Sequence, residues 1–393
     1  MNKNILKTGV QDFINNNIIT DILSVVLKKP LFTGVTQKEL AEQIEAKRKC
    51  KTKLPTLFNT PKIYYPRKLH IEQTSSETTA HYKANLVSGK CLLDLTGGLG
   101  IDAYYFSKKV GEIDHCEWDQ ELHEIASYNF KVLGALNIRT FHTDGLLFLE
   151  DSNVKYDWIY LDPARRDERQ KKVFRLSDCT PDITKHLNLL LNKSEHVLLK
   201  TAPLLDLSAG ISDLKHVTEI HIVAHHNEVK EVLWVLNTTE RDSPITIKTI
   251  NTTPTGSETF NFLWSEESET KSTFAVPHTY LYEPNAAIMK SGGFKSVGEA
   301  FGIDKLHEHS HLYTSEKHIK FPGRTFKIVN TVPFNKKAIN SLSLSKANIT
   351  IRNFPYAVAN IRKRFKIADG GNIYLFFTTD INEDRIVLVC EKC

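Results

Sequence analysis

The chain has 393 residues, of which 41% are hydrophobic, with a formal net charge of +5 and six cysteines. This length predicts about two or three domains, and the hydrophobic fraction is sufficient for buried cores, which excludes a disordered chain. No apolar run approaches the ~18 residues of a membrane span, the first residues lack the apolar block of a secretion signal, and so few cysteines do not indicate a disulfide framework. We therefore expect a cytoplasmic protein with no membrane partner.

The charge is distributed unevenly along the chain. Residues 1–70 contain 13 Lys and Arg against 5 Asp and Glu, a net charge of +8, and residues 321–393 contain 12 against 5, a net charge of +7. Residues 71–320 contain 26 against 36, a net charge of −10. Basic ends around an acidic middle favour a polyanion such as RNA at the flanks and a small ligand at the centre. Ordinary solvated lysines account for the same pattern equally well.

Residues 1–57 are predicted to be helical, because apolar residues recur there in pairs at helical spacing. One helix is predicted to begin at Thr36, which forms a capping box with Glu39. Prolines then predict an extended linker over residues 56–71.

Residues 74–102 are predicted to form a helix, a buried strand and a Gly-rich loop. Thr74 and Glu77 form a second capping-box candidate, which opens a helix as far as about Leu86. The following segment, residues 92–102, reads LLDLTGGLGID. Strands end in this way where the backbone turns sharply and passes close beneath a nucleotide-like ligand. Such a loop is a weak signal by itself, so the segments after it decide the ligand.

Four predicted strands in a row end in an acidic residue. The acids are Asp94, Glu117, Asp144 and Asp162. Glu117 lies 23 positions after Asp94, close to the spacing of about 20 residues at which an acid binds a ribose diol. Since the carboxyl ends of the strands in a doubly wound sheet line one crevice, we expect a single site there. The sequence therefore predicts an α/β fold with a Rossmann-like doubly wound sheet.

Three motifs in this order are more specific than any one of them alone. They are EQTSSETTAHYKA at residues 72–84, DLTGGLGID at residues 94–102 and LDPARR at residues 161–166. Together they resemble one bacterial family of class I S-adenosylmethionine-dependent methyltransferases, whose members carry a ferredoxin-like segment and a C-terminal THUMP-like domain. The similarity extends over nearly the whole chain and implies S-adenosylmethionine as the cofactor.

The resemblance also implies which residues bind that cofactor. Gly98 and Gly100 would lie close to its methionine portion, Glu117 would bind the ribose hydroxyls, and Asp144 would accept a hydrogen bond from the adenine amino group. Thr96 stands where the family of methyltransferases usually has its first glycine. The complete set implied is Asp94, Thr96, Gly97, Gly98, Gly100, Asp102, Glu117, Trp118, Asp144 and Gly145.

By the same resemblance, Asp162, Pro163 and Arg165 are the implied catalytic residues. They occupy the place of the Asp/Asn-Pro-Pro-Tyr motif of enzymes that methylate exocyclic amines. An acid at a strand end can hold such an amine with its lone pair aimed at the methyl group, which is catalysis by positioning. Arg165 replaces the aromatic residue that stacks on the base, and it could stack through its guanidinium plane or bind a phosphate.

Two features near this motif have a functional and a structural interpretation. The basic segment from Arg165 to Arg175 fits a substrate phosphate or a solvated helix start. Cys179 fits either a small buried cysteine, which we favour, or the nucleophile of a carbon methyltransferase. The spacing of Cys390 and Cys393 resembles that of zinc ligands, but no second pair is present, so we expect no metal.

The remainder of the chain is predicted to complete the sheet and add two small modules. A helix is predicted over residues 177–191 with Pro181 in its first turn, a fifth strand over residues 196–200, and a terminal hairpin over residues 217–236. A helix from Ala286 is predicted to end at Gly292. After residue 321 we expect strands at 326–329 and 348–351, helices at 335–344 and at 355–365 with Pro355 in the first turn, and two final strands.

The predicted organisation has five parts. These are an N-terminal helical region (1–57), a class I methyltransferase domain (58–240), a connecting segment (241–276), a ferredoxin-like segment (277–320) and a THUMP-like domain (321–393). Basic residues interleave with Phe354, Tyr356 and Phe365 in the last part, and these aromatics fit an RNA-binding face or a small core. His307, His309 and His311 are interpreted as surface histidines.

Three functions remain open at this stage. We favour a methyltransferase that acts on RNA, most plausibly at a base amine, with RNA bound by the basic ends. The main alternative is an RNA-binding protein whose methyltransferase-like domain is an inactive scaffold. A methyltransferase for protein or small-molecule acceptors is the third. The sequence does not identify the RNA, the methylated atom or the oligomeric state.

Overall fold

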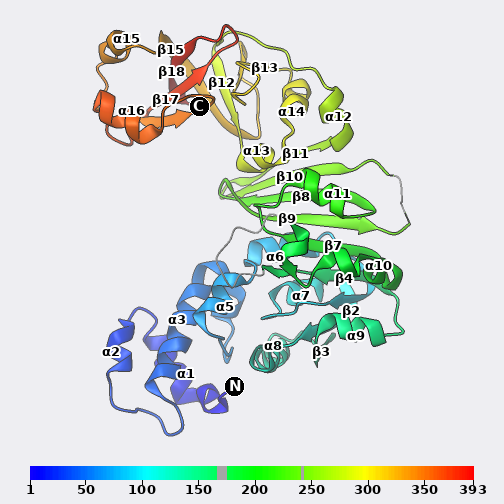
Figure 1. Ribbon diagram of the computed structural model, residues 1–393. Coiled ribbons are helices and arrows are strands. Elements are labelled where there is room, and N and C mark those ends of the chain that lie inside the picture. Colours follow the sequence, from blue (N-terminus) through cyan, green and yellow to red (C-terminus); the bar gives the residue numbers. More distant parts are fainter. Residues whose placement is uncertain (166–174, 240–242) are drawn as a thin grey trace. The chain divides into compact units, whose positions relative to one another are not determined.

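The computed structural model describes residues 1–165, 175–239 and 243–393, and Figure 1 shows their course. The chain forms two compact units, which are described separately below. The first unit contains Met1–Val217 and Trp234–Asp242, and the second contains Thr218–Leu233 and Ser243–Cys393. Among the described residues, no helix is long and apolar enough to cross a membrane.

The first unit begins with short helices. Their bounds are Lys3–Leu6 (η1, a 3-10 helix), Thr8–Asn16 (α1), Ile22–Val26 (α2), Gln37–Lys53 (α3), Pro55–Asn59 (α4), Lys68–Gln73 (α5) and Glu77–Ala84 (α6). The predicted capping box of α3 is confirmed, because the Thr36 hydroxyl accepts from the Glu39 amide at 3.2 Å and the Glu39 carboxylate accepts from the Thr36 amide at 2.8 Å. Leu40 and Ile44 on the inner face of α3 are fully buried.

Two predictions for this region are wrong in detail. Residues 56–71 are not an extended linker, because α4 and α5 lie largely within them, with Pro55 as the first residue of α4, where a missing amide costs nothing. The helix α6 is capped by Ser76, whose hydroxyl accepts from the Thr79 amide at 3.2 Å, and not by Thr74. The Glu77 carboxylate instead accepts from the Thr56 amide at 2.8 Å.

A five-stranded parallel sheet forms the centre of the first unit. Its strands are Gly89–Asp94 (β1), Val110–Glu117 (β2), Ile138–His142 (β3), Tyr156–Leu161 (β4) and Ser194–Thr201 (β7), in the order β7-β4-β1-β2-β3. The connecting helices are Ile101–Phe106 (α7), Gln120–Val132 (α8), Gly145–Asp151 (α9), Ile183–Lys193 (α10) and Leu207–Asp213 (α11). The order reverses between β1 and β4, and ligands bind at such a switch point. The predicted Rossmann-like doubly wound sheet is thereby confirmed.

The segment after β4 departs from the prediction. Ala164–Arg165 (β5) pairs with Cys179–Thr180 (β6) as a two-stranded antiparallel ribbon, and Leu176–Asp178 (η2) precedes β6. The helix predicted from residue 177 therefore begins only at Ile183. Asp182 sets this start, because its carboxylate accepts from the Thr184 amide at 3.2 Å.

The second unit begins with strands beside the Val217–His225 (β8) and Glu228–Asn237 (β9) hairpin. Thr246–Thr253 (β10) runs parallel to β8, and Gly256–Leu263 (β11) runs antiparallel to β10. The predicted hairpin is present, but it is not terminal, because β10 and β11 continue the pairing beyond it. The short helix Trp264–Glu269 (α12) follows.

A separate seven-stranded sheet occupies the C-terminal part of the second unit. Its order is Asp304–Lys305 (β13), Tyr313–Ser315 (β14), Tyr280–Pro284 (β12), Gly323–Pro333 (β15), Arg385–Lys392 (β18), Ile373–Thr379 (β17) and Asn348–Ile351 (β16). The helices are Ala286–Ser291 (α13), Phe294–Phe301 (α14), Lys336–Ser341 (α15) and Val358–Phe365 (α16). The long strand β15 pairs with both β12 and β18, so the two predicted small modules share one sheet.

The C-terminal sheet also decides three interpretations. Phe354 and Phe365 pack against a buried cluster around Phe377, which supports the core alternative for these two aromatics. The helix predicted from Pro355 begins only at Val358. Gly292 ends α13 in the left-handed region at φ 77°, as predicted.

The three histidines between α14 and β14 are not all at the surface. His307 is buried, and its Nε2 lies 2.9 Å from a carboxylate oxygen of Glu383. The ring of His311 stacks on that of Phe294 with centroids 3.6 Å apart, and burial lowers the pKa of His311 to about 4. The surface interpretation is therefore wrong for His307 and His311, because long-range packing covers them.

Candidate functional site

The Gly-rich loop after β1 is tight on one side and open on the other. Gly97 donates its amide to the Cys116 carbonyl at 2.8 Å, and a Cβ at Gly97 would lie 2.3 Å from the His115 ring, so only glycine fits. Gly98 has φ +56°, and a Cβ there would meet nothing closer than 3.9 Å. The backbone at Gly98 therefore faces open space, where a ligand can approach it closely.

Two buried acids hold this loop in place. Asp94 accepts from the Thr96 amide at 3.1 Å, and its other oxygen lies 3.2 Å from Nδ1 of His115. Glu117, at the end of β2, accepts from the Gly98 amide at 2.5 Å and from the Asp119 amide at 2.7 Å. The ends of β1 and β2 and the loop are thus one hydrogen-bonded unit.

Beyond these two acids, the strand ends contribute an exposed apolar ring and the start of helix α9. Trp118 directly follows Glu117 and is 76% exposed, although its ring is large and apolar. After β3, Asp144 accepts from the Leu146 amide at 2.8 Å and so caps α9. A Cβ at Gly145 would lie 2.3 Å from the Leu95 carbonyl oxygen, so this glycine lets α9 approach the end of β1.

Asp162 lies at the end of β4, beside the Gly-rich loop. Its backbone amide donates to the Thr96 hydroxyl at 2.7 Å. Thr96, which departs from the usual glycine, therefore ties the loop to Asp162. Pro163 is buried next to it, and the backbone of Arg165 pairs with Cys179 in the β5–β6 ribbon.

Part of the predicted acceptor region lies outside the described residues. The residues not described there are the side chain of Arg165 and the whole of residues 166–174, which include Arg166, Arg169, Lys171 and Lys172. Cys179 is buried, as expected for a structural cysteine. The role of Arg165 stays a prediction.

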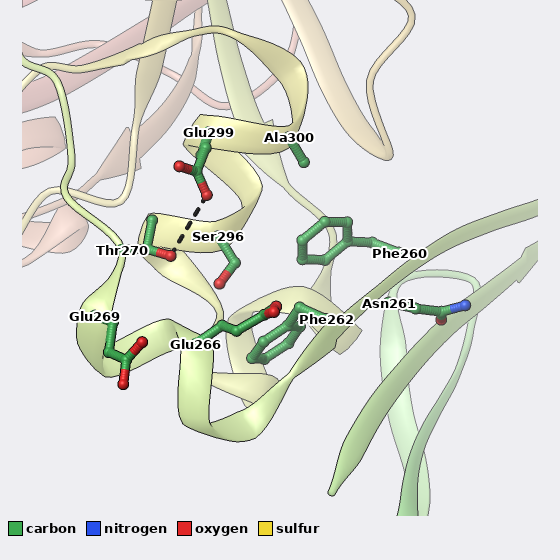
Figure 2. Close-up of a pocket in the computed structure, with 9 residues that line it drawn as sticks. All are labelled: Phe260, Asn261, Phe262, Glu266, Glu269, Thr270, Ser296, Glu299 and Ala300. Atoms are coloured by element: carbon green, nitrogen blue, oxygen red, sulfur yellow. Dashed lines mark hydrogen bonds between the residues drawn. The ribbon is translucent and has the colours of Figure 1, made fainter. Parts of the chain in front are cut away.

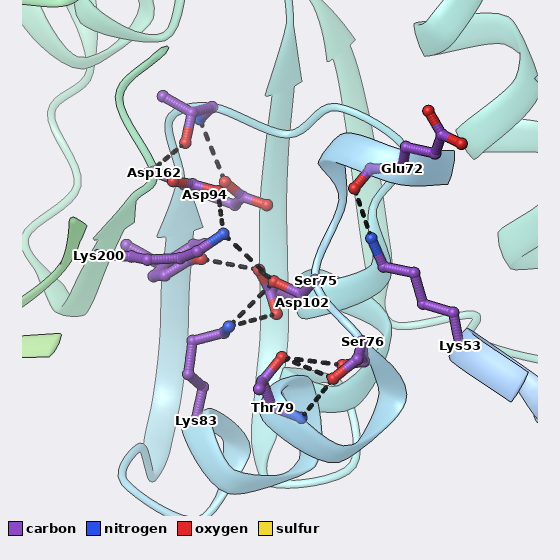
Figure 3. Close-up of polar contacts among 12 residues, drawn as sticks. Lys53, Glu72, Ser75, Ser76, Thr79, Lys83, Asp94, Asp102, Asp162 and Lys200 are labelled. Atoms are coloured by element: carbon purple, nitrogen blue, oxygen red, sulfur yellow. Dashed lines mark hydrogen bonds and ion pairs between the residues drawn. The ribbon is translucent and has the colours of Figure 1, made fainter. Parts of the chain in front are cut away.

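The structure adds a lysine to this site. Nζ of Lys200, near the end of β7, lies 2.5 Å from Oδ2 of Asp162 and 3.4 Å from the Ser75 hydroxyl (Figure 3). Lys83 is fully buried, and its Nζ lies 3.2 Å from Asp102 and 3.0 Å from the Ser75 hydroxyl. Figure 3 shows both lysines pointing toward Ser75 and Asp102.

Asp102 is the buried anion of this cluster. It accepts from Ser75 at 2.8 Å and from the Tyr160 hydroxyl at 2.7 Å. Burial by itself would raise the pKa of Asp102, but the positive charges of Lys83 and Lys200 together with these hydrogen bonds outweigh it and lower the pKa. The carboxylate stays ionised inside the protein.

Lys53, the last residue of α3, is also affected by Lys200. Its Nζ donates to the Glu72 carbonyl at 2.6 Å. Burial and then the repulsion of Lys200 lower the pKa of Lys53 to about 8. Lys53 therefore loses its proton more readily than an ordinary lysine, first through burial and then through the charge of Lys200.

The structure joins some of the predicted cofactor-binding residues with one predicted catalytic residue. Hydrogen bonds connect Asp94, Thr96, Gly98 and Glu117 with Asp162, either directly or through the loop backbone. Two other predicted residues point elsewhere, because Asp102 binds Lys83 and Ser75 and Asp144 caps a helix. The roles assigned to all of them toward a cofactor stay predictions.

Sequence reasoning assigned no role to Ser75, Lys83 or Lys200. Ser75 and Lys83 lie in the motif of residues 72–84 that marks the family, but their partners are far along the chain. The acids were predicted from their positions at the carboxyl ends of parallel strands, and Lys200 also lies near such an end. Applying that rule to basic residues as well would have found it.

The second unit contains a pocket of its own. It has a volume of about 450 Å³ and lies between β11, α12 and α14 (Figure 2). Two phenylalanine rings, Phe260 and Phe262, stack at its wall with centroids 5.6 Å apart, and Glu299 accepts from the Thr270 hydroxyl at 3.5 Å. None of the predicted site residues lines this pocket.

Comparisons with known proteins agree with these observations. A ferredoxin-like domain model matches residues 280–322, and a THUMP-like domain model matches residues 323–392. A crystal structure of a proposed methyltransferase from Porphyromonas gingivalis W83 is 31% identical, covers 100% of this chain and 98% of that chain, and superposes with a TM-score of 0.88. No curated protein matches the chain.

More distant structures match the chain only in part. An rRNA methylase from Streptococcus thermophilus is 10% identical, covers 41% of this chain and 93% of that chain, and has a TM-score of 0.30. M. capricolum TrmK, in complex with S-adenosylhomocysteine, is 15% identical, covers 42% of this chain and 69% of that chain, and has a TM-score of 0.32. These likenesses are too weak to support an argument about this chain.

The sheet of the first unit and its strand-end site define a class I methyltransferase fold. With 31% identity to the P. gingivalis protein over the full length, the chain belongs to the methyltransferase family that carries a ferredoxin-like segment and a C-terminal THUMP-like domain. The resemblance found in the motifs is thereby confirmed.

Proposed function

We propose that this protein is an S-adenosylmethionine-dependent methyltransferase that methylates an exocyclic base amine of RNA. The observation that carries the proposal is the position of Asp162. Its carboxylate lies at the end of β4, and Thr96 ties its backbone to the Gly-rich loop at 2.7 Å. A group bound at that loop and a group bound by Asp162 would meet at one strand edge.

The residues present fit the cofactor. The backbone at Gly98 is open, Glu117 is a buried carboxylate beside it, and Trp118 offers an exposed apolar ring next to Glu117. The loop would hold the amino-acid portion, Glu117 the ribose and Trp118 the adenine ring. When bound, the cofactor supplies an electrophilic methyl group on a positively charged sulfur.

Asp162 would hold the acceptor amine by accepting a hydrogen bond from one of its N–H groups, so that the nitrogen lone pair is free for the methyl group. On methylation the nitrogen would form its bond to the methyl group while the methyl–sulfur bond breaks and its electron pair returns to sulfur. Asp162, whose side chain is 37% exposed, would take the proton that the amine loses and pass it to solvent.

Two properties support RNA as the acceptor. The chain has basic ends, with net charges of +8 over residues 1–70 and +7 over residues 321–393, and basic surfaces favour phosphate backbones. The THUMP-like match over residues 323–392 agrees with an RNA-binding module. The cytoplasmic location is part of this proposal.

The scaffold alternative rests on two departures from the usual motifs, Thr96 and the Ala164–Arg165 pair. Thr96 is explained by its hydrogen bond to Asp162, which connects the two halves of an active site. A scaffold without chemistry would not need this connection, so we favour the enzyme.

Two experiments test the proposal. Isothermal titration with S-adenosylmethionine should give binding heat that is lost in Glu117→Ala, because that variant removes the carboxylate beside the loop. RNA from a strain lacking the gene should then accept labelled methyl groups from the purified protein, and nucleoside mass spectrometry would identify the product. Methyl transfer to protein instead of RNA would overturn the RNA acceptor, and absence of cofactor binding would overturn the whole proposal.

A further inference from the structure

We propose that Lys200 is a positioning residue for methyl transfer, which fixes Asp162 so that Oδ1 alone faces the acceptor amine. This inference rests on the proposed function, because it concerns the same acceptor site. It assigns a role to a residue outside the Asp-Pro-Ala-Arg motif.

The contact follows from the strand register. Leu161 of β4 pairs with Leu199 of β7, so Asp162 and Lys200 follow one residue later on adjacent parallel strands. Nζ of Lys200 lies 2.5 Å from Oδ2 of Asp162, and the lysine side chain is only 14% exposed. A charge-assisted contact of this length holds a carboxylate in one rotamer.

The second oxygen of Asp162 is available for a substrate. In the described part of the chain, no residue donates a hydrogen bond to Oδ1, and the side chain is 37% exposed. Lys200 binds one oxygen from inside the protein, and the other can accept from outside. A freely rotating carboxylate would offer either oxygen in many directions, at a cost in orientation.

Lys200 is itself fixed by alternating charges. Ser75 lies 3.4 Å from its Nζ and donates to Asp102, which is in turn paired with the buried Lys83. The order of charges from the interior outward is positive Lys83, negative Asp102, positive Lys200 and negative Asp162. Because each charge has opposite neighbours, displacement of Lys200 would leave Asp102 and Asp162 undercompensated.

The positive charge also suits the acceptor that we propose. The exocyclic amine of a base is neutral, because its lone pair is conjugated with the ring, so it needs orientation by a carboxylate and not removal of a proton before it reacts. The ammonium group of Lys200 balances the charge of that carboxylate. An ammonium already bound to a carboxylate has no lone pair, so Lys200 does not act as the base.

The test is a double-mutant cycle in methyl transfer to RNA. Lys200→Met should lower kcat about 100-fold, the loss expected when a reacting group is misplaced by about 1 Å, while the Kd for S-adenosylmethionine and the KM for RNA change about twofold or less. Lys200→Arg should restore most of the rate, since arginine keeps the charge. In the Asp162→Asn background, Lys200→Met should add little, because the neutral amide no longer needs the lysine.

The outcomes separate this inference from the proposed function. If the wild-type protein methylates no RNA, the proposed function fails, and the inference with it. If the wild type is active but the losses of Lys200→Met and Asp162→Asn multiply, or Lys200→Arg is as slow as Lys200→Met, only the positioning role is overturned. Loss of cofactor binding in Lys200→Met would also overturn it.

A stability measurement, which does not depend on catalysis, completes the double-mutant cycle. The same four proteins unfolded in urea should show a coupling between Asp162 and Lys200, because each residue stabilises the charge of the other. Lys185→Met is the matched control, since Lys185 also pairs with an aspartate, Asp182, but is itself 71% exposed. It should leave both kcat and the coupling unchanged, and absence of coupling between Asp162 and Lys200 would contradict the contact itself.

Discussion

Each unit of the molecule buries a carboxylate among basic side chains, and the two clusters differ in where their charges lead. In the first unit, Asp102 binds Lys83, and the chain of charges continues through Lys200 to the half-exposed Asp162. In the second unit, Glu283 on β12 is held by Arg324 and Arg352, and no other described residue extends these ion pairs.

The two clusters show that a buried charge can have a structural or a functional role. Arg324 is part of β15, and Arg352 directly follows β16, so Glu283 connects the ferredoxin-like and THUMP-like segments of one sheet. Its ion pairs hold two segments of one sheet together, which indicates a structural role. The cluster around Asp102 ends at a carboxylate beside the Gly-rich loop, which favours a role in the acceptor site that we propose.

The largest expected effect is a loss of activity on substitution in the first cluster, which substitution in the second cluster should not cause. Asp162→Ala should lower methyl transfer to RNA by about 1000-fold, because the acceptor amine loses the group that orients it. The Kd for S-adenosylmethionine should change little, and the unfolding free energy should fall only by the loss of the ion pair with Lys200. Single-turnover methylation and isothermal titration would measure this, and a variant that retains normal activity would exclude Asp162 from the acceptor site.

The opposite result is expected for the second cluster. Glu283→Gln should lower the unfolding free energy by about 2 kcal/mol, because two arginines lose a charged partner, although their partial exposure moderates the loss. Cofactor binding in the other unit should be unchanged.

Urea unfolding measures this change. Glu228→Gln serves as the control, because Glu228 forms an exposed ion pair with Lys230 and its loss should leave the unfolding free energy almost unchanged. Equal losses in the two variants would refute the structural role of Glu283.

A smaller effect is expected at Thr96. Thr96→Val removes the hydroxyl that accepts from the Asp162 amide at 2.7 Å, and a buried donor without a partner costs about 1–3 kcal/mol. We expect kcat to fall about tenfold with a modest loss of stability, and Thr96→Ser to retain the wild-type rate. A rate in Thr96→Val equal to that of the wild type would show that the loop and Asp162 are positioned independently.

These contrasts also indicate what the sequence could predict. The alternation of strands and helices with acids at the strand ends was sufficient for the Rossmann-like sheet, because β1 and β4 contain short apolar runs that the sequence shows locally. The positions of Asp94, Glu117 and Asp162 at one edge follow from that order alone.

The remaining features depend on partners distant in the sequence. Lys200 contacts Asp162, which lies 38 residues earlier, and Ser75, which lies 125 residues earlier. The hydrogen-bond partner of His307 is Glu383, 76 residues later. Periodicity carries no information about such pairs, and proline content misplaced the linker because Pro55 begins a helix as readily as it ends one.

The smallest expected effect is a pH dependence that originates in the charge cluster of the first unit. Burial and the charge of Lys200 lower the pKa of Lys53 to about 8 from an ordinary value of 10.5. Between about pH 8 and 10.5 the folded protein holds Lys53 neutral while the unfolded chain keeps it protonated. The unfolded state then binds more protons, so this group makes stability rise with pH in that window.

Lys53→Met removes this contribution. Below about pH 8 the wild type bears the cost of a half-buried ammonium, and above that pH the cost declines as the proton is lost. The variant should therefore be more stable to unfolding than the wild type at pH 7, and this difference in unfolding free energy should be smaller at pH 9.5. Urea unfolding at both pH values measures the difference, with Lys51→Met on the exposed face of the same helix correcting for the loss of one charge. An advantage that grows with pH would contradict a lowered pKa of Lys53, whose first cause is burial and whose second is the charge of Lys200.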